Sequence, residues 1–423
     1  MSSRVVRPDG RGFLLFDAHP AGCARLVDDL AAEAGPPLPA AGRAAADRPV
    51  AVVIGSSAGY GLAATLAGVV RHGMHGVAVC FEKPAAARRT ATAGWYRSRR
   101  VAQLAEHRGS RLEFVNADCF QDSTRERVLS LVEERFGRVD HLIYSVAAPR
   151  RPDPLTGRSL TSVIKPLGAP YPARMLGFDD AGAPRLVDTS VEPATEEQRR
   201  ATVHVMGGGD WAAWVTALAG RNLLGPRFRT VALSYVGSEL TAPIYRRGTI
   251  GAAKDDLEAT ARQLTEGLLA ERGGAALTSV NGVAVTPASM AIPGIALYSA
   301  LLRRVLGERM QSPLRQMVRL WDLLADDAAP ATDATGRLRL DDWELLPQVQ
   351  AEVADAWHRV GPANLEEYAD TQWLRTELLR LYGFEVPGVD YTAPVETELP
   401  WPESTGPALT SVPAGPPAGP SSI

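Results

Sequence analysis

The sequence is poor in cysteine and contains no long apolar run. It has three cysteines in 423 residues, Cys23, Cys80 and Cys119, and no two of them form a CxxC pair. This spacing argues against a disulfide framework and a cysteine-ligated zinc site, so we predict no metal site and a reducing, cytoplasmic location. No stretch reaches the roughly 20 apolar residues that span a bilayer, and the first residues lack the apolar core of a signal peptide. We therefore expect no membrane association.

The sequence also lacks an excess of charge of either sign. There are 45 lysines and arginines and 48 aspartates and glutamates, which gives a net charge of −3. This balance provides no global positive field for nucleic acid and no acidic excess of the kind found in disordered chains. Apolar residues make up 45% of the chain, which is ordinary for a globular protein with a sizeable core.

Short apolar runs alternate with helical patterns through the first two thirds of the chain. Strands are predicted at residues 50–54, 76–81, 112–115, 141–145, 229–233 and 276–280. Strands that alternate with helices predict an α/β fold of the Rossmann type, a doubly wound parallel sheet. Additional helical segments are expected beside this sheet.

The composition divides the chain into four parts. Residues 1–48 are predicted to form an arm packed on the core, and 49–290 the dinucleotide-binding catalytic core, with an insertion at about 150–205. Residues 291–401 are predicted to be a mainly helical part of the same domain. Residues 402–423 have little apolar content and are expected to be disordered.

A glycine-rich turn follows the first strand, with the spacing GxxxGxG at Gly55, Gly59 and Gly61. Glycines there allow the backbone to turn tightly and approach a pyrophosphate, which the amino terminus of the next helix stabilises. Any tight strand-to-helix connection can use glycines, so the turn alone is weak evidence for a dinucleotide.

Polar residues at neighbouring strand ends strengthen this interpretation. Glu82 ends the second strand, where a carboxylate accepts a hydrogen bond from the ribose 2′-hydroxyl of NAD and repels the 2′-phosphate of NADP. The alternative interpretation of Glu82 is a solvated acid at a strand end. Asp118 ends the third strand and is placed to contact the adenine. Residues 145–148 follow the fourth strand and are placed to line the cofactor cleft.

A tyrosine and a lysine nine positions apart, Tyr245 and Lys254, form the most informative pair in the chain. A phenol is a slow acid at neutral pH, and a neighbouring ammonium stabilises the phenolate that it leaves. In one continuous helix the two side chains would face opposite ways. We therefore predict that Tyr245 precedes a helix, that Gly248 interrupts the chain, and that Lys254 lies near the helix start. Tyr235 is either a second phenol in the pocket or a strand-end aromatic.

Other residues that could carry function have structural alternatives. Trp211 and Trp214 share one helix face and are expected in the core, and His72 and His75 are expected in a surface loop. The pair Arg150 and Arg151 is interpreted as a solvated charge run, with contact to an anionic carrier as the alternative.

At these residues the chain resembles the FabV-type enoyl-acyl-carrier-protein reductases and the related trans-2-enoyl-CoA reductases, from about residue 10 to about 393. The segments that carry the resemblance are VVIGSSAGYGLA at 52–63, FEKP at 81–84, TAGWY at 92–96, IYSVAAPRR at 143–151, VEPATEE at 191–197, VMGGGDW at 205–211, residues 234–254, IPGIALY at 292–298 and LRLDDWEL at 338–345. Many of these strings are absent from ordinary short-chain reductases.

The resemblance implies NADH-dependent reduction of the trans-2 double bond of an enoyl thioester on acyl carrier protein or CoA, the last step of a fatty-acid-type elongation cycle. Hydride goes to Cβ, Tyr245 donates the proton, Lys254 contacts the cofactor, and Tyr235 contacts the substrate. The resemblance also implies that the additional helical segments cover the substrate. Implied NAD contacts are Gly55, Ser56, Ser57, Ala58, Gly59, Tyr60, Phe81, Glu82, Asp118, Cys119, Val146, Ala147, Lys254, Ala284, Val285 and Thr286.

The chain departs from the family pattern at two positions. Pro287 stands where a polar residue is usual, which affects the fine shape of the cofactor end. Ala242 stands where a tryptophan is usual, which opens the acyl pocket. Two other functions stay open: a carbonyl reductase of the short-chain dehydrogenase type, which would place tyrosine and lysine on one helix face, and a non-catalytic nucleotide-binding scaffold. We expect a monomer that binds no nucleic acid.

Overall fold

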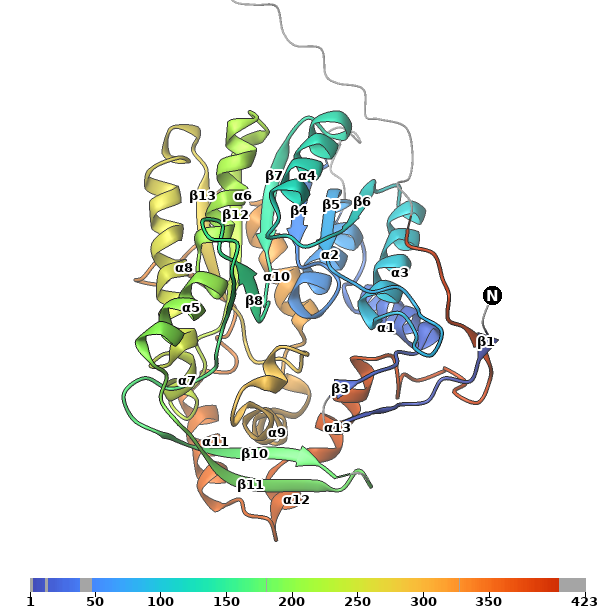
Figure 1. Ribbon diagram of the computed structural model, residues 1–423, viewed down its shortest axis with the longest axis vertical. Helices are drawn as coiled ribbons and strands as arrows, with labels where there is room; N and C mark the ends of the chain where they lie inside the picture. Colours follow the sequence, from blue (N-terminus) through green and yellow to red (C-terminus); the bar gives the residue numbers. More distant parts are fainter. Residues whose placement is uncertain (1–2, 12–13, 39–47, 180, 327, 403–423) are drawn as a thin grey trace, which may run out of the picture.

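A parallel β-sheet forms the centre of the molecule (Figure 1). The computed structural model describes residues 3–11, 14–38, 48–179, 181–326 and 328–402. Within these residues the central sheet has seven strands in the order β14-β13-β12-β7-β4-β5-β6. The strands are β4 (Val50–Ile54), β5 (His75–Cys80), β6 (Leu112–Asn116), β7 (Val139–Tyr144), β12 (Leu224–Ser234), β13 (Ala275–Val280) and β14 (Arg337–Arg339).

All the neighbouring strands of this sheet run parallel, so the predicted doubly wound fold is confirmed. Every residue of β4 and β5 is buried. Strands covered on both faces carry continuous apolar runs, which explains why the sequence marked them clearly. The order in which strands are added to the sheet switches sides between β4 and β7, and ligands of such sheets bind outside the carboxyl ends of the strands at that point.

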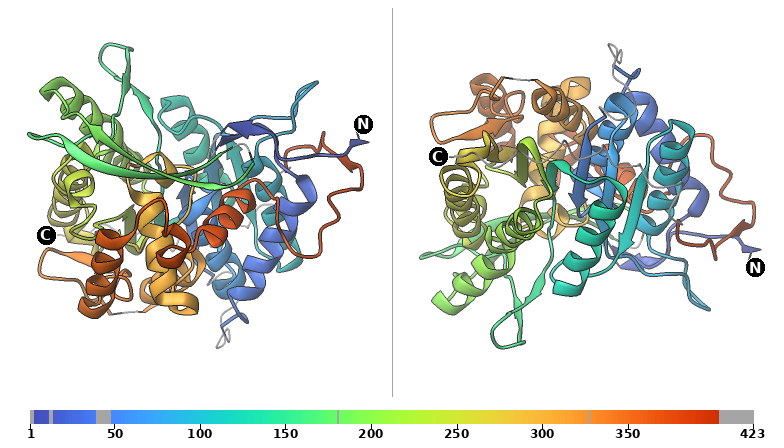
Figure 2. Two further views of the ribbon diagram at one scale, coloured as in Figure 1. Left: turned by 90° about the horizontal axis from the view of Figure 1, so that it is seen from below. Right: turned by 90° about the horizontal axis from the view of Figure 1, so that it is seen from above.

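Helices cover both faces of the sheet (Figure 2). One face packs against α1 (Pro20–Glu33), α2 (Gly59–His72), α3 (Ala93–His107) and α10 (Pro313–Ala325). The other packs against α4 (Asp122–Arg135), α6 (Gly209–Gly220) and α8 (Thr249–Glu266). Trp211 and Trp214 are fully buried in this second layer, as the sequence predicts.

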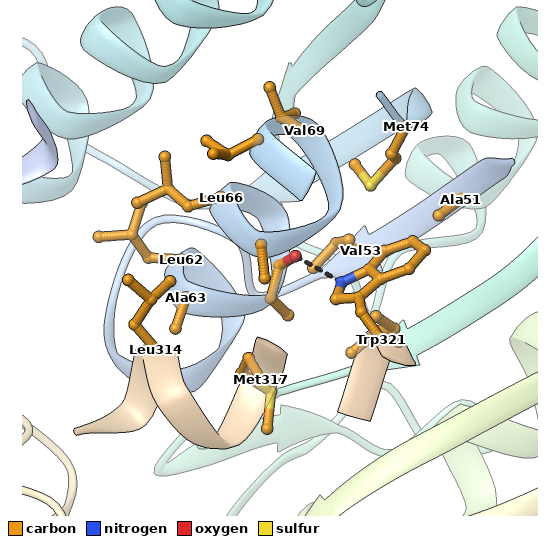
Figure 3. Close-up of a cluster of buried hydrophobic side chains, with 14 of the residues drawn as sticks. Ala51, Val53, Leu62, Ala63, Leu66, Val69, Met74, Leu314, Met317 and Trp321 are labelled. Carbon is orange, nitrogen blue, oxygen red and sulfur yellow. Dashed lines mark hydrogen bonds between the residues drawn. The ribbon is translucent and has the colours of Figure 1, made fainter. Parts of the chain in front are cut away.

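The closest packing on the first face joins α2 to α10 (Figure 3). Trp321 of α10 is fully buried, and its indole N–H donates to the backbone oxygen of Ala64 at 2.7 Å. Gly68 of α2 leaves the space for the ring, because a Cβ there would collide with the indole. This contact fixes the helix that starts at the glycine turn.

A third layer lies at the carboxyl ends of the strands, beneath the sheet in Figure 1. It contains α9 (Ile295–Leu306), α11 (Pro347–Arg359), α12 (Leu365–Tyr368), α13 (Thr371–Arg380) and the antiparallel hairpin of β10 (Tyr171–Phe178) and β11 (Pro184–Val191). Its apolar cluster joins residues of these elements to Ile244 and Tyr245. We infer that 291–401 belongs to the same domain as 49–290.

Shorter elements complete the described chain. The insertion also contains β8 (Arg150–Pro152), β9 (Ser159–Thr161) and α5 (Glu196–Met206), and α7 (Ala242–Tyr245) precedes α8. The 3₁₀ helices are Ala270–Arg272, Ser289–Ala291 and Gly307–Arg309. Strand β2 (Gly10–Arg11) pairs with β3 (Leu14–Leu15), and β1 (Ser3–Arg4) pairs with β15 (Val395–Glu396). The tail predicted to be disordered, apart from residue 402, lies outside the described residues.

Two expectations about charged residues were wrong. Arg151 is buried: its guanidinium group lies 3.7 Å from the Asp210 carboxylate and donates to a backbone oxygen, whereas Arg150 is exposed. His72 and His75 lie in α2 and β5 rather than in a surface loop. Both imidazole rings are buried, and the Nδ1 atom of His75 accepts from the Arg111 backbone N–H at 2.8 Å. In the part of the chain that the structure describes, no helix is long and apolar enough to cross a membrane.

Candidate active site

The glycine turn lies at the centre of the carboxyl edge, between β4 and α2. Gly55 has φ +88°, a conformation that favours glycine, and a Cβ on Gly61 would collide with the Gly55 carbonyl oxygen. Ala58, the N-cap residue of α2, makes no side-chain capping hydrogen bond. The first N–H groups of this 14-residue helix are therefore left for another acceptor, and a phosphate suits them by geometry and by charge.

The Glu82 carboxylate is held beside this turn. Its Oε1 atom accepts from the Ser57 hydroxyl at 2.5 Å, and its Oε2 atom accepts from the hydroxyl of Thr92, the N-cap residue of α3. A Cβ on Gly94 would collide with the carboxylate, which explains the glycine of the TAGWY segment. Glu82 is thus oriented by both neighbouring helix starts and is not a freely solvated acid.

The other predicted cofactor residues follow the ends of β4, β5, β6, β7 and β13. Phe81 has 73% of its surface exposed, so its ring is open to a planar partner. The Asp118 carboxylate accepts from the Phe120 backbone N–H at 3.0 Å. A Cβ on Gly59 would lie 3.1 Å from the Thr286 methyl group, which brings the loop after β13 against the turn. The remaining predicted contacts are Ser56, Cys119, Val146, Ala147, Ala284 and Val285.

The Tyr60 side chain is hydrogen-bonded to other residues of the protein. Its hydroxyl group lies 2.5 Å from the Gly282 carbonyl oxygen and 3.2 Å from the Gln316 side-chain oxygen. The side chain ties the start of α2 to the loop after β13, so any cofactor contact of Tyr60 would involve its backbone.

The Tyr/Lys segment folds as its spacing predicts. Tyr245 ends the short helix α7, Gly248 is the N-cap residue of α8, and Lys254 lies in the second turn of α8. The two residues are on different helices, unlike the single helix face expected for a carbonyl reductase. Ala242, the first residue of α7, is buried.

Tyr235 and Tyr245 meet at the carboxyl edge. Their ring centroids are 4.5 Å apart with an interplanar angle of 73°, an edge-to-face contact. Within the described residues the Tyr245 hydroxyl group makes no hydrogen bond, whereas the Tyr235 hydroxyl donates to Glu344 Oε1 at 2.8 Å. Burial and the negative charge of Glu344 raise the pKa of Tyr245 above its usual value, so the phenol keeps its proton at neutral pH.

Within the described residues the Lys254 ammonium group makes a single hydrogen bond. Its Nζ atom donates to the Leu233 carbonyl oxygen at 3.4 Å, beside the end of β12. Burial lowers the pKa of Lys254 to about 8, partly offset by the carboxylate of Glu258. An anionic or hydroxyl-bearing ligand at this edge would find a cation there.

Glu344 was not among the predicted site residues. It follows β14, is fully buried, and contacts Tyr235, Tyr298 and the backbone N–H of Val283. The sequence signal that could have identified Glu344 is its position as an acidic residue among the apolar residues Trp343, Leu345 and Leu346. Apolar neighbours on both sides suggest a buried position, and buried acids concentrate at functional sites.

The residues of this edge fit a nicotinamide dinucleotide. The uncapped start of α2 suits the pyrophosphate, and the oriented Glu82 carboxylate suits a ribose hydroxyl. At the end of β12 the buried Ser234 hydroxyl has no hydrogen-bond partner within the described residues, which is expected of a group that a ligand completes.

Three family models match consecutive parts of the chain. The NAD(P)H binding domain of trans-2-enoyl-CoA reductase matches residues 5–87, and the trans-2-enoyl-CoA reductase catalytic region matches residues 89–324. A domain described as the enoyl reductase FAD binding domain matches residues 332–395.

Similar proteins cover nearly the whole chain. An enoyl-[acyl-carrier-protein] reductase [NADH] of Streptomyces avermitilis is 55% identical over 94% of this chain and 100% of its own length. A trans-2-enoyl-CoA reductase of Euglena gracilis is 38% identical over 95% of this chain and 74% of its own. The crystal structure of the Treponema denticola trans-2-enoyl-CoA reductase in complex with NAD has a TM-score of 0.84 and 34% identity, and covers 92% of this chain and 98% of its own.

The residues of 332–395 do not fit a flavin dinucleotide. Such a cofactor needs a phosphate-binding turn or a helix start with free N–H groups. No glycine lies between β14 and α11, and the start of α13 is capped by the carboxylate of Asp370. The start of α11 has no side-chain cap, but its first residue is Pro347, which has no N–H group, and its N-cap residue is the apolar Leu346. Helix α11 packs Val349 and Val353 into the same apolar cluster as α9. The segment contributes core and the buried Glu344, and we assign no chemical step to a flavin.

Proposed function

The chain belongs to the family of NADH-dependent enoyl-acyl-carrier-protein and trans-2-enoyl-CoA reductases, and from this premise we propose that it reduces the trans-2 double bond of an enoyl thioester. The observation that carries the proposal is the pairing of a partner-free phenol, Tyr245, with a second phenol, Tyr235, at the edge that fits the dinucleotide. A scaffold without chemistry has no need of a buried phenol whose proton is uncommitted.

The protein's residues supply binding, orientation and a proton. NADH, when bound, supplies the hydride that reduces the β carbon. Tyr245 donates a hydrogen bond to the thioester oxygen as negative charge develops there, and then supplies the proton that converts the enolate to the saturated thioester, with the new C–H bond at Cα. Lys254 stabilises the phenolate that Tyr245 leaves and binds a ribose hydroxyl. One donor placed at a developing oxyanion contributes about 3–4 kcal/mol to lowering the barrier.

The test is NADH oxidation with crotonyl-CoA, beside the same acyl group on acyl carrier protein. We expect turnover of at least one thioester, and none with the corresponding ketone. Oxidation of NADH by ketones but not by enoyl thioesters would favour the carbonyl reductase instead.

We further propose that the enzyme is a monomer in the cytoplasm. All three cysteines are unpaired and two of them are buried, which suits a reducing compartment. Light scattering at assay concentration should give the mass of one chain, 45.1 kDa. A larger mass with concentration-dependent activity would contradict the proposal.

Cofactor preference should follow Glu82. Its carboxylate, fixed by Ser57 and Thr92, repels a 2′-phosphate, so kcat/KM should be much higher with NADH than with NADPH. Glu82→Ala should narrow that ratio, while Glu106→Ala, an exposed acid on α3, should leave it unchanged. Equal kcat/KM values for the two cofactors in the wild type would show that the carboxylate does not discriminate.

NADH binding should weaken as pH rises through about 8. Lys254 is charged below its pKa of about 8 and neutral above it, so its attraction for the cofactor is lost on the alkaline side. The dissociation constant, measured by NADH fluorescence from pH 6 to 9.5, should rise in the wild type. In Lys254→Met the dissociation constant should be higher and independent of pH. In Lys254→Arg, which keeps its charge throughout, the constant should also be independent of pH. An unchanged constant in Lys254→Met would remove Lys254 from the cofactor site.

A further inference from the structure

A chain of hydrogen bonds runs through the buried carboxyl group of Glu344. Its Oε1 atom lies 2.8 Å from the hydroxyl groups of both Tyr235 and Tyr298, and its Oε2 atom accepts from the Val283 N–H at 2.5 Å. The side-chain amide of Gln350 donates to the Tyr298 oxygen at 3.0 Å. The order of groups is therefore Gln350, Tyr298, Glu344 and Tyr235.

The protonation state of Glu344 decides where the Tyr235 proton points. A phenol has one proton to donate, and an ionised carboxylate can only accept. When Glu344 is ionised, Oε1 takes the protons of both phenols, and Tyr235 has none left for a substrate oxygen. The edge-to-face contact with Tyr245 places Tyr235 beside the proposed proton donor, where this difference matters.

When Glu344 is neutral, the hydrogen bond between Glu344 and Tyr235 changes direction, so that the carboxyl group donates and the phenol oxygen accepts. Because Oε2 is occupied by the Val283 N–H, the carboxyl proton lies on Oε1, between the two phenols. The Tyr298 oxygen accepts a hydrogen bond from the Gln350 N–H, and the Tyr298 O–H donates to Oε1. The carboxyl O–H in turn donates to the Tyr235 oxygen. Every donor then points the same way along the chain, an arrangement in which hydrogen bonds strengthen one another. The Tyr235 O–H is left to donate outward.

We propose that Glu344 is a positioning residue that controls Tyr235: neutral, it directs the Tyr235 proton to the thioester oxygen, and ionised, it withholds that proton. The proposal rests on the enoyl reductase function proposed above. It makes Tyr235 a second oxyanion donor beside Tyr245 that is present only below a certain pH.

The surroundings of Glu344 place its ionisation in the working range. Burial raises the pKa of Glu344 to about 7, and the hydrogen bonds from Val283, Tyr235 and Tyr298 partly oppose the rise. Asp341, itself paired with Arg339 at 2.8 Å, adds a negative charge that raises the pKa further. The titratable groups that interact with the carboxyl group are Tyr60, Tyr235, Tyr245, Tyr298 and Asp341. Glu344 is neutral below this pKa and ionised above it.

The first test compares kcat at saturating NADH from pH 6 to 9 in the wild type and Glu344→Gln. The glutamine oxygen can accept from Val283, and its amino group can donate to Tyr235 at every pH. The wild-type kcat should fall about 10-fold between pH 7 and 8.5, since one donor is worth about 100-fold or more when fully lost. Glu344→Gln should lack this fall and keep only the smaller loss centred near pH 8, where Lys254 loses its charge. The same fall in both proteins would overturn the proposal.

A double-mutant cycle shows whether Glu344 acts through Tyr235. Two variants that act through the same group are non-additive, so in a Tyr235→Phe background Glu344→Gln should change kcat less than about 2-fold, and the fall centred near pH 7 should be gone. Tyr298→Phe is the matched control, because it removes the other phenol from the same oxygen and should keep a pH-dependent fall. A fall that persists in Tyr235→Phe would mean that Glu344 acts through another group.

An infrared measurement needs no substrate and separates this proposal from the function it rests on. The difference spectrum between pH 6 and 8 should contain the C=O band of a protonated carboxyl group that is absent in Glu344→Gln. The band should shift in Tyr235→Phe, where the carboxyl proton loses its acceptor. If the wild type oxidises no NADH with enoyl thioesters but the band is present and shifts in Tyr235→Phe, the enoyl reductase function is wrong and the hydrogen-bond direction stands. A band that does not respond to Tyr235→Phe overturns the hydrogen-bond direction.

Discussion

Tyr245→Phe is expected to lower kcat about 100-fold or more while leaving NADH affinity nearly unchanged. The phenylalanine keeps the edge-to-face packing against Tyr235 but removes the proton donor and one oxyanion hydrogen bond, each worth about 100-fold in measured enzymes. Because the Tyr245 hydroxyl group has no hydrogen bond within the described residues, its removal leaves no buried partner unsatisfied. Stopped-flow turnover and fluorescence titration with NADH measure the two quantities.

The pattern across three variants identifies the donor. Tyr235→Phe should be milder than Tyr245→Phe, since an intact proton donor remains. Lys254→Met should differ from both by weakening NADH binding as well as turnover. If Tyr245→Phe turns over at nearly the wild-type rate and Tyr235→Phe is inactive, the roles of the two tyrosines are exchanged.

Trp321→Ala is expected to lower the free energy of unfolding by about 3–5 kcal/mol, the range for removing a buried large aromatic side chain. The indole fills the space that Gly68 leaves between α2 and α10 and donates a hydrogen bond to the Ala64 carbonyl oxygen, so the change leaves a cavity and removes that hydrogen bond (Figure 3). Equilibrium unfolding in urea measures the loss.

The comparison is Trp373→Ala, because Trp373 of α13 is only partly buried and its ring lies 5.7 Å from the Arg303 guanidinium carbon. This change should cost clearly less than Trp321→Ala. Equal losses would mean that the α2–α10 contact is not a principal source of stability.

The central sheet could be predicted because its strands carry their own pattern. The strand at Val50–Ile54 was located to the residue, and the neighbouring strands were located within a few residues, since continuous apolar runs reflect burial on both faces. Strand β14 was missed: three residues with two arginines resemble a loop inside a helical segment. The hairpin at 171–191 was also unassigned, because all of its β11 residues are exposed or only half-buried and give no apolar run.

The site could be predicted where local spacing carried the information. The position of Tyr245 before the helix that carries Lys254 followed from helix geometry and Gly248, whereas the short helix α7 that contains Tyr245 was not predicted. Glu82 followed from the end of β5. Glu344 and Arg151 were not recognised, since the environment of a buried charge is set by distant residues. Glu344 meets Tyr235 across 109 positions, and Arg151 meets Asp210 across the insertion.

The pairing of β1 with β15 has a consequence for how the chain is made. Residues 3–4 lie beside residues 395–396, and the Tyr96 hydroxyl donates to the carbonyl oxygen of Thr397 at 2.7 Å. Contacts between such distant segments form late, because a long loop must close first. On the ribosome, β1 and the Tyr96 hydroxyl therefore stay without these partners until almost the whole described chain has been synthesised. Until then the backbone groups of Ser3 and Arg4 lack the hydrogen-bond partners that β15 provides in the folded protein.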